Sequence, residues 1–166
     1  MIHGHSNVYV VTYRPNYVSF ETSLDDVDQY MSGCITKETE IILIGHSYGG
    51  VIANSIHKKG WNVKHAVYVA APLNGSSIIK KFEWCIPILK APVFQYLKYK
   101  DKDEPPPHPF TTISMGWFWS KFDGKLFKKE TIIDPLNHIH ISFSGHVAIT
   151  SENVMKNIRN ALIERS

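Results

Sequence analysis

The sequence predicts an α/β fold, a three-layer α/β/α sandwich built around a mostly parallel sheet. Two observations lead to this prediction. Short, nearly continuous apolar runs alternate along the chain with amphipathic helical runs, which is typical of parallel strands covered on both faces. The chain has 166 residues, enough for one domain with its own core. We therefore expect a single domain over residues 1–166.

The expected strands are short runs rich in β-branched, aromatic and aliphatic residues, and each is followed by a turn or a helical pattern. They are 8–13, 41–44, 65–70, 110–115 and 138–143.

The helices are predicted from their caps and apolar stripes. Ser23, with Asp26 three residues later, is the expected N-cap of a helix that reaches Gly33. A second helix is expected over 49–59 and should stop at Gly60. A final amphipathic helix should begin near Ser151, with a buried stripe made of Val154, Met155, Ile158, Ala161 and Leu162.

The most informative motif is Gly-His-Ser-Tyr-Gly-Gly at residues 45–50. An apolar strand precedes it and a helical run follows it directly, which is the context of a G-x-S-x-G nucleophile elbow. Small residues two before and two after the serine let the strand and helix backbones cross closely. The helix start then directs N–H groups at negative charge that develops beside Ser47. Ser47 is the predicted nucleophile.

Composition excludes several other classes. The formal net charge is +3 and no basic run is longer than two residues, so we expect no nucleic-acid partner. The two cysteines form neither a disulfide framework nor a zinc motif, and His3-x-His5 and His138-x-His140 lack a third ligand at useful spacing. We expect no metal and no cofactor. The sequence shows no signal-peptide pattern and no apolar run of 18 residues, so we expect a cytoplasmic protein.

A nucleophilic serine needs a base and an orienting acid. His146, just past the last predicted strand, is the expected base, because sites on parallel sheets gather at the carboxyl ends of the strands. Three downstream carboxylates are candidates for the acid: Asp123, Glu130 and Asp134. Asp123-Gly124 fits the loop after the fourth strand and is favoured. Asp134-Pro135 fits a turn entering the last strand, and it remains an alternative, as does the option that neither aspartate serves.

Five segments resemble the α/β-hydrolase superfamily of lipase and esterase type. They are 13–15 (Tyr-Arg-Pro), 45–50, 69–76 (Val-Ala-Ala-Pro-Leu-Asn-Gly-Ser), 122–126 (Phe-Asp-Gly-Lys-Leu) and 144–149 (Ser-Gly-His-Val-Ala-Ile). The resemblance covers nearly the whole chain except 77–109. It implies ester hydrolysis through an acyl-enzyme, with a triad of Ser47, Asp123 and His146. The backbone N–H of Tyr48 would be one oxyanion donor.

The chain departs from the family at its N-terminus. The family's second oxyanion donor follows an earlier strand, often at a His-Gly pair. His3-Gly4 precedes the first predicted strand by only a few residues, whereas a parallel crossover needs a dozen or more. We therefore expect an N-terminally reduced α/β-hydrolase fold. A second hypothesis follows, in which the chain is a catalytically impaired module that binds a lipid or a protein partner.

The segment 77–109 is expected to form a cap or lid over the site. It carries twelve large apolar residues between 78 and 99, with lysines scattered among them. Trp84 and Phe94 from this segment, with Trp117 beyond the fourth strand, are the predicted substrate-binding residues. The expected substrate is a small-molecule or lipid ester, with a membrane surface as an alternative contact. The simpler interpretation is a cap that only packs on the core.

Overall fold

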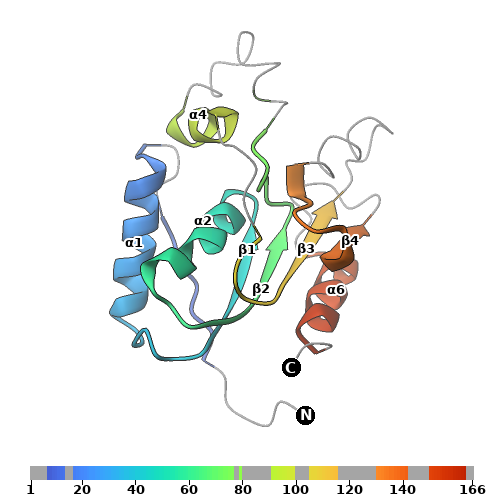
Figure 1. The fold of residues 1–166 in the computed structure, drawn as a ribbon, viewed down its shortest axis with the longest axis horizontal. Helices are drawn as coiled ribbons and strands as arrows, with labels where there is room; N and C mark the ends of the chain where they lie inside the picture. Colours follow the sequence, from blue (N-terminus) through green and yellow to red (C-terminus); the bar gives the residue numbers. More distant parts are fainter. Residues whose placement is uncertain are drawn as a thin grey trace.

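A computed structural model describes residues 7–13, 17–76, 79, 91–99, 105–115, 130–141 and 150–163. Four strands form one sheet in the order β1-β2-β3-β4, and each neighbouring pair is parallel (Figure 1). The strands are β1 (Ile41–His46), β2 (Val63–Val69), β3 (Phe110–Met115) and β4 (His138–Ile141). This arrangement confirms the predicted α/β class with a parallel sheet.

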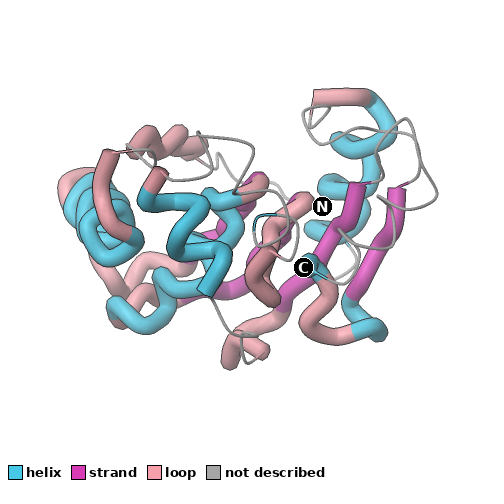
Figure 2. The backbone as a smooth tube through the Cα atoms, turned by 90° about the horizontal axis from the view of Figure 1, so that it is seen from above, coloured by secondary structure: helices cyan, strands magenta, loops and turns pink. Residues whose placement is uncertain are grey.

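In the described part of the chain, four α-helices and two 3₁₀ turns accompany the sheet, whose strands are magenta in Figure 2. The α-helices are α1 (Phe20–Ser32), α2 (Tyr48–Ile56), α4 (Pro92–Tyr99) and α6 (Glu152–Ile163). The 3₁₀ turns are η1 (His57–Lys59) and η3 (Pro135–Asn137). Among the helices just named, no helix is long and apolar enough to cross a bilayer.

The two faces of the sheet bury separate cores. Ala66 and Tyr68 of β2 belong to the cluster that holds the buried apolar residues of α1 and α2. Val67 and Val69 belong to the cluster that holds the buried residues of α6. Successive strand residues point to opposite faces, so one strand serves both cores. This is the three-layer arrangement that near-continuous apolar strands predict.

The helix limits follow the predictions with two corrections. Gly60 ends η1 with a φ of 85°, so the predicted stop is confirmed. Ser19, not Ser23, caps α1: its hydroxyl accepts from the Thr22 N–H at 3.2 Å. The helix starts earlier because Phe20 is buried in the core, which leaves Ser23 fully buried inside the helix. In α6, Met155 is 52% exposed and does not belong to the buried stripe.

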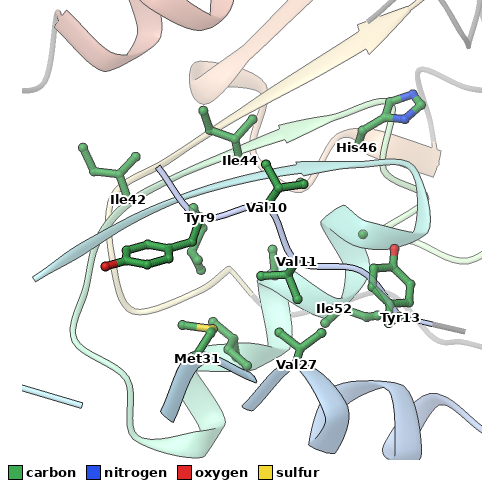
Figure 3. A pocket seen from close by; sticks show the side chains of 15 residues that line it. Tyr9, Val10, Val11, Tyr13, Val27, Met31, Ile42, Ile44, His46 and Ile52 are labelled. Carbon is green, nitrogen blue, oxygen red and sulfur yellow. The ribbon is translucent and has the colours of Figure 1, made fainter. Parts of the chain in front are cut away.

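The prediction of a buried strand over 8–13 is wrong. Residues 7–13 have no regular secondary structure, and the Val8 and Val10 side chains are 86% and 75% exposed. The segment lies beside β1 across a cavity (Figure 3). A β-prone sequence becomes a strand only when a neighbour supplies the ladder of hydrogen bonds, and no described strand does so here.

Candidate active site

Ser47 occupies a sharp turn between β1 and α2. Its backbone has φ 54° and ψ −128°, a conformation that non-glycine residues rarely adopt. The Ser47 N–H donates to the Val69 carbonyl of the adjacent strand at 2.9 Å, and the Gly50 N–H donates to the Ser47 carbonyl at 3.0 Å. These two bonds hold the strained residue in place, and strain of this kind collects at functional sites.

The flanking glycines are required by close backbone contact. A Cβ on Gly45 would lie 2.5 Å from the Gly50 Cα and 2.7 Å from the Gly49 carbonyl oxygen. A Cβ on Gly50 would lie 2.4 Å from the Ala71 Cβ. The small residue predicted two before the serine is therefore one that the crossing of β1 and α2 needs. The second tight position is Gly50, three after the serine, whereas a Cβ on the predicted Gly49 would meet only the Tyr13 hydroxyl.

The position of Ser47 suits attack on an electrophile. The residue is half-buried, and its side chain makes no capping hydrogen bond to α2. The first amides of a helix have no acceptor within the helix, so the N–H of Tyr48 lies where it can donate to an oxyanion. The positive end of the α2 dipole acts in the same direction.

A second strained residue lies at the end of the neighbouring strand. Ala70, directly after β2, has φ 48°, and its N–H donates to the Ile113 carbonyl at 2.7 Å. Ser47 and Ala70 are the non-glycine residues with positive φ in the described part of the chain. Both lie at the carboxyl edge of the sheet, where parallel-sheet sites form. Sequence reasoning missed Ala70, since alanine gives no local signal for this conformation.

The segment after Ala70 is anchored to a distant part of the chain. The Asn74 N–H donates to the Glu130 carbonyl at 2.9 Å, and the Asn74 side-chain amide donates to the Ile132 carbonyl at 2.7 Å. The Ser76 hydroxyl donates to the Glu130 carboxylate at 3.3 Å. Glu130 is only 6% exposed. One of the candidate acids thus has a structural role in holding residues 74–76.

An aromatic layer covers the start of α2. The Tyr48 ring lies 6.1 Å from Tyr13, 6.2 Å from Phe20 and 6.3 Å from Tyr96, measured between centroids. Phe20 and Tyr96 stack at 4.0 Å with an interplanar angle of 5°. Burial raises the pKa of the Tyr48 phenol and that of Tyr13, so both stay neutral at physiological pH. Sequence reasoning had not assigned Phe20 or Tyr96 to this layer.

Phe94 lies on α4, which packs against α1 (Figure 1). Its side chain is partly buried against the core, and its neighbours Val93 and Leu97 are each 5% exposed. The described part of the predicted cap therefore packs on the core. The other two predicted substrate-binding residues, Trp84 and Trp117, lie outside the described residues.

The predicted acid Asp123 and base His146 also lie outside the described residues. The alternative acid, Asp134, makes the turn into β4 that its sequence predicts. Its carboxylate accepts from the Leu136 N–H at 2.9 Å and from the Asn137 side-chain amide at 2.6 Å. These bonds occupy both carboxylate oxygens of Asp134 within the turn.

The histidines of β4 bind hydroxyl groups. Ser114 lies 2.9 Å from the His138 Nε2 and 2.7 Å from the His140 Nδ1, and Thr112 lies 2.8 Å from the His138 Nδ1. Within the described ranges, no three histidine, cysteine or acidic side chains gather as a metal site would require. The arrangement on β4 is a polar network between two strands.

Comparisons with solved structures find enzymes of the α/β-hydrolase fold. A thermophilic esterase from Thermogutta terrifontis matches with a TM-score of 0.57 at 17% identity, over 98% of this chain and 77% of that one. Polyneuridine aldehyde esterase matches with a TM-score of 0.56 at 12% identity, over 89% of this chain and 80% of the other. The Vlm2 thioesterase domain matches with a TM-score of 0.56 at 11% identity, over 90% of this chain and 75% of that one. At these identities the likeness shows the fold.

A scan with protein-family models finds no match for this chain, and a search of curated protein sequences finds none either.

Proposed function

We propose that this chain is a serine hydrolase that cleaves carboxylic esters through an acyl-enzyme intermediate. The observation that carries the proposal is the strained, half-buried Ser47 between β1 and the start of α2. Proteins keep such strain where it positions a reacting group. The fold that the chain shares with two esterases and a thioesterase domain supports the same chemistry.

In the proposed reaction, the Ser47 hydroxyl attacks the ester carbonyl and passes its proton to His146. Asp123 orients the imidazole and stabilises its charged form. The oxyanion of the tetrahedral intermediate accepts from the Tyr48 N–H, and the α2 dipole favours its charge. His146 then protonates the leaving alcohol, and water releases the acyl group by the reverse sequence of proton transfers.

A fluorophosphonate probe with mass-spectrometric site mapping tests the proposal. We expect labelling at Ser47, none in Ser47→Ala, and strongly reduced labelling in His146→Ala. Turnover of p-nitrophenyl esters should fall by at least about 10³-fold in Ser47→Ala. Ser32→Ala is the matched control, because Ser32 is exposed at the end of α1, and it should label like the parent protein. A folded parent protein that does not label would refute the proposal.

We further propose that the substrate is an apolar acyl ester, which the protein takes from solution or from a membrane surface. Trp84, Phe94 and Trp117 would form the acyl site. Shortening the acyl chain from octanoyl to acetyl should then lower kcat/KM. Replacing Trp84 by Ser should flatten that preference and leave acetyl-ester cleavage in place. Phe94→Ser is less decisive, since Phe94 packs on the core and its loss also lowers stability. Equal rates on both esters would remove the lipid part of the proposal.

A second candidate function is a catalytically impaired module that binds a lipid or a protein partner. The observation that favours it is the position of β1 at the end of the described sheet. A second oxyanion donor from a strand on that side is not among the described residues, and losing one donor costs about 10²–10³ in rate. Probe labelling without ester turnover would favour the impaired module. Turnover that disappears in Ser47→Ala would exclude it.

A further inference from the structure

The Tyr13 hydroxyl lies against the turn that carries Ser47. A Cβ on Gly49, two residues after the serine, would lie 2.9 Å from the Tyr13 hydroxyl oxygen. The ring centroids of Tyr13 and Tyr48 are 6.1 Å apart. Figure 3 shows the Tyr13 hydroxyl pointing toward the start of α2. The phenol therefore reaches the end of the helix at which the Tyr48 N–H is the proposed oxyanion donor.

A cavity adjoins this hydroxyl. Tyr13 and three residues of the turn, Gly45, His46 and Gly49, line the same cavity of about 370 Å³ (Figure 3). None of the lining residues is Asp, Glu, Lys or Arg, so no charged side chain of the lining competes for a hydrogen bond with the phenol. The cavity therefore gives the Tyr13 hydroxyl room to donate to a bound substrate.

The state of the Tyr13 side chain suits a donor. Burial raises the pKa of its phenol above the ordinary value, so the hydroxyl keeps its proton at physiological pH. Among the described residues, no acceptor binds that hydroxyl. The ring packs against the core and beside Tyr48, which limits the positions that the hydroxyl can take. A neutral hydroxyl held in place with its proton unused is a group that can stabilise an oxyanion.

One backbone amide does not exhaust the hydrogen bonds that an oxyanion accepts. The Gly50 N–H already donates to the Ser47 carbonyl at 3.0 Å, so it is committed within the turn. A side chain that reaches the turn from another segment can supply a further donor, and tyrosine is one of the residue types that enzymes use for this purpose. Tyr13 is such a side chain, since it comes from the segment that precedes α1.

We propose that the Tyr13 hydroxyl is a second oxyanion donor, which acts together with the Tyr48 N–H. The inference rests on the proposed function, because it assigns a donor to the intermediate that forms at Ser47. As the ester carbonyl becomes tetrahedral, its oxygen gains negative charge and accepts a hydrogen bond from each donor. No proton is transferred from Tyr13, which stays neutral throughout the reaction.

Tyr13→Phe tests the proposal, because it removes the hydroxyl and keeps the ring beside Tyr48. We expect kcat for a p-nitrophenyl ester to fall about 10²-fold while KM changes less than about 3-fold, since the donor acts in the transition state. Tyr9→Phe is the matched control. It removes a hydroxyl from the same segment, where Tyr9 is 44% exposed, and it should leave both constants unchanged. Thermal melts verify that both variants fold.

A thionoester substrate separates an oxyanion donor from a packing role. Its tetrahedral intermediate carries the negative charge on sulfur, which accepts hydrogen bonds weakly. The loss of rate in Tyr13→Phe should therefore shrink to less than about 5-fold on the thionoester. A variant that only disturbs packing around Ser47 would lower the rates on both substrates alike.

Gly49→Ala tests the same donor by displacing it. The new Cβ would push the Tyr13 hydroxyl aside, so ester turnover should fall at least about 10-fold. Without the hydroxyl, the nearest ring carbon of residue 13 lies 3.9 Å from that Cβ, which is an ordinary contact. In the Tyr13→Phe background, Gly49→Ala should therefore lower turnover by less than a further factor of about 2.

The outcomes distinguish this proposal from the proposed function. If Ser47 labels with the fluorophosphonate probe and Tyr13→Phe turns over the ester as fast as the parent protein, the Tyr13 donor is overturned and the hydrolase stands. Equal losses on the ester and the thionoester would assign Tyr13 a packing role and would also overturn the donor. A parent protein that neither labels nor turns over esters would remove the proposed function and this inference with it.

Discussion

β1 is more apolar in sequence than β3, yet it is the more exposed of the two strands. β1 contains four consecutive aliphatic residues, yet Ile42 and Ile44 are 47% and 53% exposed. β3 contains two threonines and a serine, yet all six of its residues are buried. The reason is position: in the sheet that the described residues form, β3 has a strand on each side, whereas β1 has one. Hydrophobicity makes a segment suitable for the interior, but neighbours decide whether it is buried.

The largest expected effect is at the carboxyl end of β1, where the backbones of β1 and α2 cross closely. Gly45→Ala would place a Cβ 2.5 Å from the Gly50 Cα, and both atoms belong to rigid backbone. We expect the free energy of unfolding to fall by more than about 4 kcal/mol, since the close crossing of β1 and α2 cannot persist. Chemical denaturation measures this change.

Gly49→Ala is the control within the same turn. Its new Cβ would meet the Tyr13 hydroxyl at 2.9 Å, and that hydroxyl is the end of a side chain that can rotate away. We expect the free energy of unfolding to fall by less than about 1 kcal/mol. Equal losses for the two variants would mean that the crossing is not the tight point of β1.

The next effect compares the same substitution in the two strands. Ile113 of β3 is fully buried, so Ile113→Ala should cost about 3 kcal/mol through lost burial and the cavity it leaves. Ile44→Ala should cost less than about 1 kcal/mol, because its side chain is half exposed. Urea denaturation of both variants measures these losses in the free energy of unfolding. A cost at Ile44 near that at Ile113 would show that β1 is covered in solution.

The same contrast explains what the sequence could predict. Alternation of apolar runs with amphipathic helices predicted four of the strands. Each of these runs does form a strand that pairs with a neighbouring strand of the sheet. Gly45, Ser47 and Gly49 predicted the turn between β1 and α2, because the turn depends on residues that are close in sequence. The close contact at Gly50 was not predicted. Gly60 likewise predicted the end of η1 from a local conformational need.

Features that depend on distant residues could not be predicted. The prediction of a strand over 8–13 was wrong because a strand needs a hydrogen-bonded neighbour, and the position of that neighbour depends on tertiary structure. The strain at Ala70 and the anchoring of Asn74 by Glu130 arise from contacts across more than 40 residues. Ser47 lies at the predicted turn, while Asp123 and His146 remain predictions, since both lie outside the described residues.

A smaller effect concerns pH and the amino ends of the inner strands. His65 at the start of β2 and His108 before β3 are 4% and 8% exposed. The His108 ring lies 5.5 Å from that of His57, and its Nε2 is 3.2 Å from the Tyr68 hydroxyl. Desolvation, with the nearby His57 and His65, lowers the pKa of His108 to about 4.

The sign of the pH effect follows from linkage. Between pH 6.5 and about 4 the unfolded chain binds a proton at His108 that the folded chain does not. The contribution of neutral His108 to the free energy of unfolding is therefore present above pH 6.5 and is lost as the pH falls toward 4. We expect a loss of about 2 kcal/mol from this group, measured by denaturation at pH 7 and pH 4.5. His108→Gln keeps a donor near Tyr68 but cannot titrate, so its stability should fall less; an equal fall would assign the effect to other groups.

The smallest expected effect is at the amino end of β1. The charged groups there are exposed, whereas the histidines at the amino ends of the inner strands are buried. Lys64 and Glu40 form an ion pair there at 2.9 Å, and their side chains are 44% and 58% exposed. Water screens such a pair, so a double-mutant cycle of Lys64→Ala and Glu40→Gln should give a coupling below about 0.5 kcal/mol that shrinks further at high salt. A coupling above about 1.5 kcal/mol would show that this end of β1 is shielded from water, and the contrast between β1 and β3 would then be confined to Ile42 and Ile44.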